Sequence, residues 1–216
     1  MEDCLAASES GAKKQRYEKT LRALVTALFQ ANLVSDGVVV DAGANTGEES
    51  CMYANFGRRV HAVDPLFANV QHIKRVYGRL KLLQPMLGAL GERPGEMQFW
   101  ARKPLHRVAG KQIENLFDAD NNLGTPGVGR PQNFSVFALD GLFAPRGLWS
   151  GERLAFAHLD MEGSELAAIR GGLKTIARDL PILSTEARLG ERAKSTRELY
   201  TLVCAASRLE PYPVWL

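Results

Sequence analysis

Residues 38–47, with the sequence VVVDAGANTG, constrain the fold more than any other part of this chain. A run of β-branched residues predicts a buried strand ending at Asp41. A turn with Gly43 and Gly47 follows, and residues 48–56 can form a helix. Strand, glycine turn and helix in this order open a nucleotide-binding α/β domain, in which ligands bind at the carboxyl ends of the strands. Glycine lets such a turn approach the ligand closely.

The spacing of the turn separates two classes of cofactor. A nicotinamide site prefers G-x-G-x-x-G, because a pyrophosphate lies against backbone amides at the helix N-terminus. Here the spacing is G-x-N-x-G, and Glu48 and Glu49 open the helix. These carboxylates would repel a pyrophosphate and suit a ligand with cationic groups, such as S-adenosylmethionine. Asp64, at the end of the next predicted strand, is placed to bind ribose hydroxyls, a feature that both classes share.

Length and composition narrow the class of protein. A chain of 216 residues predicts one domain, residues 17–216, after a flexible tail of residues 1–16. The net charge of +3 is spread along the chain and indicates no nucleic-acid partner. We expect no membrane span and no signal peptide. The cysteines are few and odd in number, which favours a reducing compartment without disulfides and a cytoplasmic location.

The rest of the chain alternates between strand and helix patterns. An amphipathic helix over residues 21–33 precedes the first strand, and Gly171 and Gly172 break a later helix. Further strands are expected at residues 80–87, 97–100, 134–139, 154–160 and 181–186, with helices at 67–77 and 195–207. Residues 102–133 read as an irregular basic loop, either an acceptor-binding lid or a solvated insertion. The pattern predicts a three-layer, Rossmann-like α/β fold with a mostly parallel sheet.

Four of the predicted strands end in an acid: Asp41, Asp64, Asp160 and Glu186. The carboxyl ends of parallel strands meet at one edge of a sheet. Buried charges without partners are costly, so a cationic, hydroxyl-rich ligand at this edge is the simplest explanation for the four acids.

A series of short motifs resembles the FkbM family of S-adenosylmethionine-dependent methyltransferases, which have the class I fold. In chain order they are VVVDAGANTGEES, VHAVDP, LGALGERPG, VFALDGLF, HLDMEGSELAAIRGG and PILSTE, within residues 37–190. The first motif is shared by most class I methyltransferases and is therefore less specific. LDMEGSE, which matches the family's D-x-E-G-x-E, is the most specific.

The resemblance implies roles for individual residues. The residues implied to surround the methionine end of the cofactor are Asp41, Gly43, Asn45 and Gly47. Asp64 would hold the ribose, Leu87 and Gly88 would border the adenine, and Asp160 would lie near the transferable methyl. The family usually has Glu in place of Asp64. Its sheet ends in an antiparallel hairpin, of which residues 210–216 can supply at most the first strand, so we expect an incomplete C-terminal hairpin.

Methyl transfer to an alcohol needs a group that takes up the proton. The candidates are Asp160 and Glu162, with His158 behind them on the same side of the strand. Each has a structural alternative: His158 as a core histidine, and Glu162 with Glu165 as charges at a helix N-terminus. A divalent metal is a further possibility for four residues, although their spacing matches no known metal site: Asp160, Glu162, Glu186 and His158.

The sequence therefore predicts a methyltransferase that uses S-adenosylmethionine to methylate a hydroxyl of a small molecule or sugar. Two other classes stay open. One is a non-catalytic cofactor-binding or scaffolding module derived from a methyltransferase. The other is a nicotinamide-dependent oxidoreductase, which the missing third glycine disfavours.

Overall fold

A computed structural model describes residues 12–101, 106–108, 111–113, 130–161, 163–185, 198 and 201–205. Its centre is a five-stranded parallel sheet in the order β10-β9-β1-β2-β3. The strands are β1 (Val38–Ala42), β2 (Val60–Asp64), β3 (Leu83–Leu87), β9 (Leu154–Leu159) and β10 (Ile182–Thr185). Strand β1, which carries the glycine turn, is therefore central, with β9 on one side and β2 on the other.

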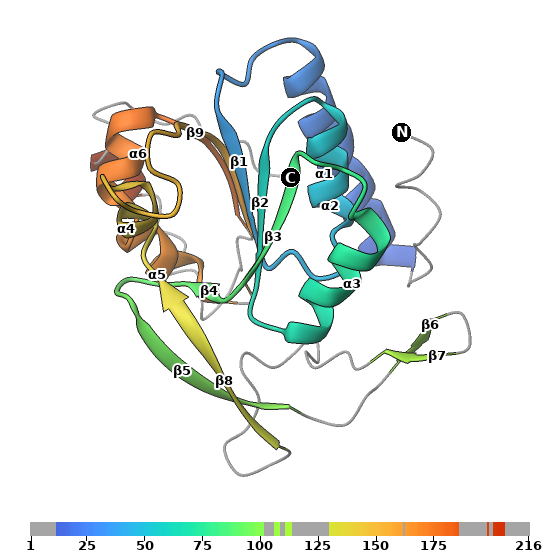
Figure 1. The fold of residues 1–216 in the computed structure, drawn as a ribbon. Helices are drawn as coiled ribbons and strands as arrows, with labels where there is room; N and C mark the ends of the chain where they lie inside the picture. The colour runs from blue at the N-terminus through green and yellow to red at the C-terminus, as the bar shows by residue number, and fades with distance from the viewer. Residues whose placement is uncertain are drawn as a thin grey trace.

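Helices cover both faces of this sheet (Figure 1). On one face lie α1 (Ala12–Gln30), α2 (Glu48–Asn55) and α3 (Phe67–Tyr77). On the other lie α4 (Leu139–Phe143), α5 (Glu165–Arg170) and α6 (Leu173–Asp179). Alternate residues of the strands enter two cores: Val39 and Phe156 pack toward α1 and α2, whereas Val40 and Ala157 pack toward α4 and α5. The predicted three-layer α/β fold is confirmed.

Burial explains the strand sequences. Every residue of β1, β2 and β9 is buried, which is why these strands read as continuous hydrophobic runs and not as alternating ones. Strand β3 contains Pro85, which weakened its prediction. The strand nevertheless forms, with Pro85 opposite Ala62, because β3 is the edge strand and has a neighbour on one side only.

A smaller sheet starts where β3 ends. It contains β4 (Ala89–Leu90), β8 (Arg130–Phe137) and β5 (Gly95–Ala101) in that order, with β5 and β8 antiparallel. A separate pair, β6 (His106–Val108) and β7 (Lys111–Ile113), lies within the stretch predicted to be irregular. The prediction for residues 102–133 is thus wrong for these strands and for the start of β8. The β8 residues there have little strand propensity, and pairing with β5 decides their conformation.

The ends of the chain are described only in part. Helix α1 begins at Ala12, so the predicted boundary of the tail at residue 16 falls inside a helix. Of the predicted helix 195–207, residues 198 and 201–205 are described and helical, while the expected strand at 210–216 lies outside the described residues.

The structure bears on two expectations, the absence of disulfides and the absence of a membrane span. Cys51 on α2 is disulfide-bonded, so the expectation of a chain without disulfides is wrong. The spacing of cysteines in a sequence does not reveal which of them the fold brings together. The cysteines therefore give no support to a reducing compartment. Within the described part of the chain, no helix is long and apolar enough to cross a bilayer.

Asp140 joins the helices of one face. Its carboxylate accepts hydrogen bonds from the backbone N–H groups of Thr175 (2.8 Å) and Lys174 (3.2 Å), in the first turn of α6. Its own N–H donates to the carbonyl of Gly171. These amides have no partner inside the helix, so Asp140 caps α6 from a neighbouring helix. The acid of the motif VFALDGLF thus has a structural role.

We expect Asp140→Ala to lower the free energy of unfolding by about 1–2 kcal/mol, because the half-buried amide of Thr175 loses its acceptor. Asp140→Asn keeps one acceptor oxygen and should lose about half as much. Urea denaturation followed by circular dichroism measures both variants. Equal stability of Asp140→Ala and the wild-type protein would contradict this role.

Candidate functional site

The glycine turn crosses the carboxyl end of β1 in a left-handed conformation. Its φ angles are +83° at Gly43, +47° at Asn45 and +82° at Gly47. A Cβ atom on Gly43 would lie 1.9 Å from the carbonyl oxygen of Asp160, and one on Gly47 would lie 2.8 Å from Cγ1 of Ile73. The turn therefore packs against the end of β9 on one side and against α3 on the other, and only glycine fits both positions.

Asp64 ties this turn to the next helix. Its Oδ2 accepts the backbone N–H of Asn45 (2.9 Å), and its Oδ1 accepts the N–H of Leu66 (2.8 Å) and the side-chain amide of Asn69 (3.2 Å). A carboxylate has about four acceptor positions, so one remains, on Oδ2. That position could accept one ribose hydroxyl. Asp64, the residue predicted to bind the ribose, thus also holds the backbone of Asn45 in place.

Burial affects the charge of Asp64. The residue is 2% exposed, and this desolvation raises its pKa to about 6 in spite of its three hydrogen-bond donors. The charge of Asp41 makes a smaller contribution to this rise in the pKa of Asp64. The carboxylate form, which accepts hydroxyl hydrogen bonds best, therefore predominates only above about pH 6.

Asp41 is buried, and its carboxylate is hydrogen-bonded within the protein. Its carboxylate is 1% exposed, and both oxygens have partners within the protein. Oδ1 accepts a hydrogen bond from Nδ1 of His158 on β9 (2.9 Å), and Oδ2 accepts one from the hydroxyl of Ser50 on α2. The predicted role of Asp41 at the methionine end of a cofactor was not tested, but its side chain is engaged beneath the turn.

Arg22 changes the charge balance at the start of α2. Its guanidinium contacts Glu48 (2.7 Å) and Glu49 (2.8 Å), and all three side chains are partly buried. Burial lowers the pKa of Arg22, but Glu49 and Glu48 together raise it above its ordinary value. The two acids therefore have a cationic partner in α1.

These contacts correct part of one step of the sequence analysis. Of the four strand-end acids expected to need a cationic ligand, Asp41 and Asp64 have hydrogen-bond donors within the chain. Glu48 and Glu49, at the start of α2, have Arg22 as a cationic partner. The premise that the acids lack partners is therefore wrong for Asp41 and Asp64, whereas Asp160 is exposed and Glu186 lies outside the described residues. Evidence for the class of ligand must come from the shape of the site and from the fold.

The candidate proton acceptors differ in how exposed their side chains are. Asp160 follows β9 directly and is exposed, whereas His158 is buried beneath it against Asp41. Glu162 and Glu186 lie outside the described residues. Among the described residues, no group of three His, Cys, Asp or Glu side chains could hold a metal, and the hypothesis of a metal site that includes Glu162 and Glu186 was not tested.

The last acid of the motif LDMEGSE shapes the loop after β9. One carboxylate oxygen of Glu165 accepts the backbone N–H groups of Met161 (2.9 Å) and Gly163 (3.0 Å). Glu165 is 7% exposed and lies in the first turn of α5. It holds the loop that follows Asp160, a structural role through hydrogen bonds to the loop backbone.

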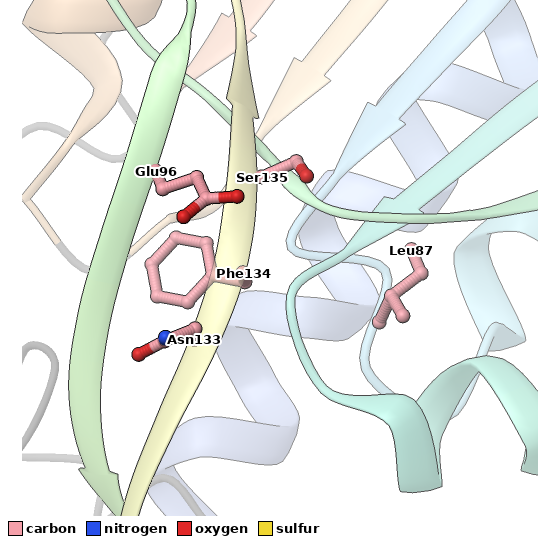
Figure 2. A pocket seen from close by; sticks show the side chains of 5 residues that line it. All are labelled: Leu87, Glu96, Asn133, Phe134 and Ser135. Atoms are coloured by element: carbon pink, nitrogen blue, oxygen red, sulfur yellow. The ribbon is translucent and has the colours of Figure 1, made fainter.

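A hollow of about 140 Å³ lies beside Leu87. In Figure 2, Leu87 at the end of β3 faces one side of it, and Glu96, Asn133, Phe134 and Ser135 come from the β5–β8 pair on the other side. Gly88 forms the bend beside it, where a Cβ atom would lie 2.6 Å from the ring of Phe137. Leu87 is opposite Asp64 in the sheet, so this hollow adjoins the predicted ribose site.

Sequence reasoning missed three residues of this site: Arg22, Ser50 and Asn69. Arg22 contacts residues 26 and 27 positions away, which no local pattern reveals. Ser50 and Asn69 are ordinary residues of α2 and α3. The only signal for them was their place in the first turns of helices that follow strands ending in an acid.

Comparison with known proteins supports the fold. No family model matches the chain, and no curated protein matches it in a sequence search. A structure search finds the crystal structure of the methyltransferase FkbM from Methylobacillus flagellatus KT, with 19% identity and a TM-score of 0.53. The match covers 80% of this chain and 38% of that one, so the chain spans less than half the length of that protein. The chain has an FkbM-like methyltransferase fold.

Two glycines test how tightly the turn is packed. Gly43 (φ +83°) and Gly57 (φ +76°) have nearly the same backbone conformation, but a Cβ on Gly57 meets nothing within 4 Å. Both alanine variants pay about 1 kcal/mol for the left-handed conformation. We expect Gly43→Ala to lower the free energy of unfolding more than Gly57→Ala does, by at least about 2 kcal/mol in total, because the backbone at Asp160 must also move. Urea denaturation measures both variants. Equal losses would show that the turn does not rest on β9.

Proposed function

We propose that this protein is an S-adenosylmethionine-dependent methyltransferase that methylates a hydroxyl of a small molecule or sugar. The observation that carries the proposal is the turn of residues 43–47. It lies left-handed across the carboxyl end of the central strand, bonded through Asn45 to Asp64, in an FkbM-like methyltransferase fold. Open α/β sheets bind their ligands at this place.

The described residues fit the parts of this cofactor in order. The methionine end would lie at the turn that Gly43, Asn45 and Gly47 form, of which Asn45 is exposed and Gly43 partly exposed. The ribose would donate a hydroxyl hydrogen bond to the remaining position on Oδ2 of Asp64. The adenine would enter the hollow beside Leu87, which is large enough for only part of a ligand.

The cofactor supplies a methyl group already activated on a sulfonium, so the protein's main task is to align the acceptor and exclude water. Asp160 is the proton acceptor that we favour, because it is exposed at the end of β9 and beside the turn at Gly43. Glu162 remains a second candidate. A carboxylate is a suitable acceptor because it is ionised at neutral pH.

Calorimetric titration with S-adenosylhomocysteine tests the cofactor class, with NADH as the parallel control. We expect binding of the first and not of the second, because no third glycine prepares a pyrophosphate site. Binding of NADH alone would favour an oxidoreductase. Binding of S-adenosylhomocysteine without turnover on any hydroxyl acceptor would favour a cofactor-binding module, and binding of neither would overturn the proposal.

The pKa of Asp64 predicts how binding depends on pH. Below about pH 6 the carboxyl is protonated and accepts hydroxyl hydrogen bonds less well, so the affinity for S-adenosylhomocysteine should rise as the pH increases through 6. Asp64→Asn cannot titrate and should show weak binding with no step there. Carbon-detected NMR of the Asp64 carboxyl in the ligand-free protein identifies the titrating group. A wild-type affinity that is flat across this range would contradict direct contact with the ribose.

A further inference from the structure

Three residues from three elements form a hydrogen-bonded chain beneath the glycine turn. Ser50 on α2 donates to Asp41 on β1, and Asp41 accepts from His158 on β9. Asp41 and His158 are direct partners in the register of the two strands, which places their side chains on the same face. All three are nearly inaccessible: Ser50 is 0%, Asp41 1% and His158 8% exposed.

This geometry fixes the orientation of the imidazole. A carboxylate oxygen only accepts hydrogen bonds, so Nδ1 of His158 carries a proton and donates it to Asp41. The ring is further enclosed by Tyr53, whose ring lies edge-on at 6.3 Å between centroids. His158 is therefore a donor held in place inside the protein, whereas Asp160 is the exposed group at the same strand end.

The chain spans the elements that shape the turn. Asp41 directly precedes the turn, Ser50 lies in the helix that follows it, and His158 lies just before the backbone of Asp160, on which Gly43 rests. If the donor from His158 is removed, the buried carboxylate of Asp41 loses one of its two partners. A movement of β1 or α2 that lets water reach the carboxylate would restore the missing hydrogen bond at the lowest cost in free energy. Such a movement would also displace the turn.

We propose that His158 is a positioning residue that acts through Asp41 and Ser50 to hold the cofactor-binding turn, and that it is not the base that deprotonates the acceptor. This inference rests on the proposed function for its ligand, S-adenosylmethionine, but not for its geometry. It assigns to Ser50 an indirect role in binding, through its hydrogen bond to Asp41 beneath the turn.

The groups around His158 determine its charge. Burial alone lowers its pKa, but the hydrogen bond to Asp41 and the charge of Asp41 outweigh burial, and Glu49 on α2 and Asp160 after β9 add to the effect. The pKa of His158 is consequently raised above its ordinary value. Tyr53 stays neutral, since burial raises the pKa of its hydroxyl well above the ordinary value, and Arg22 on α1 partly offsets Glu49.

A pair of substitutions separates positioning from catalysis. His158→Asn keeps an amide N–H in reach of Asp41 but cannot act as a base, whereas His158→Phe removes the donor and keeps a ring. We expect His158→Asn to bind S-adenosylhomocysteine within about threefold of the wild-type affinity, and His158→Phe to bind at least about tenfold more weakly. His72→Asn on α3, where His72 bonds to Arg75 and not to Asp41, is the matched control and should bind normally. Wild-type binding by both His158 variants, or equal loss in both, would overturn the inference.

A second measurement does not depend on the ligand or on the fold of His158→Phe. NMR titration of the His158 imidazole should show a pKa above that of His72, whose pKa is lowered by burial and by Arg75. Ser50→Ala removes one donor to Asp41, which strengthens the pull of Asp41 on the imidazole and should raise the pKa of His158 further. If the protein binds no S-adenosylhomocysteine, the proposed function fails, and this titration still decides whether the chain of hydrogen bonds exists. An ordinary pKa that Ser50→Ala leaves unchanged would overturn it.

Discussion

The carboxylate of Asp41 lies in the interior at the end of the central strand, where an ionised group without partners costs several kcal/mol. The two donors that compensate it come from α2 and β9, so satisfying one charge fixes the distance between three elements. Asp64, one strand away, is also a buried acid whose donors come from different elements, the glycine turn and α3. The shape of the candidate site follows from how these two buried acids are satisfied.

Local patterns were enough for most of the main sheet. Helix α3 has the predicted bounds, and strand β2 ends at Asp64 as predicted. An amphipathic helix leaves a helical period in the sequence and a buried parallel strand leaves a continuous apolar run, and both patterns depend only on neighbouring residues. The start of β8 was missed because Arg130 and its neighbours owe their conformation to pairing with β5. Arg22 was missed for a related reason: its partners are set by the packing of α1 on α2.

Two of the four acids at the strand ends, Asp41 and Asp64, have partners within the chain. A sequence shows charges without their partners, and these two acids look uncompensated until Ser50, His158 and Asn69 are placed beside them. The glycines are different, because the left-handed turn requires them and the motif itself predicts that turn. Gly43 has no room for a Cβ atom, and that constraint is visible both in the motif and in the structure.

The hydrogen bond between Asp41 and His158 joins residues 117 positions apart. During synthesis, β1 with its turn and α2 leaves the ribosome long before β9 exists. Until then the carboxylate of Asp41 has only Ser50 to satisfy it, and β1 lacks one of its two neighbours in the sheet. Contacts so distant in sequence form late, because a long loop must close first. The nascent N-terminal half therefore carries the glycine motif without the strand on which Gly43 packs, and the candidate site is complete only when β9 docks beside β1.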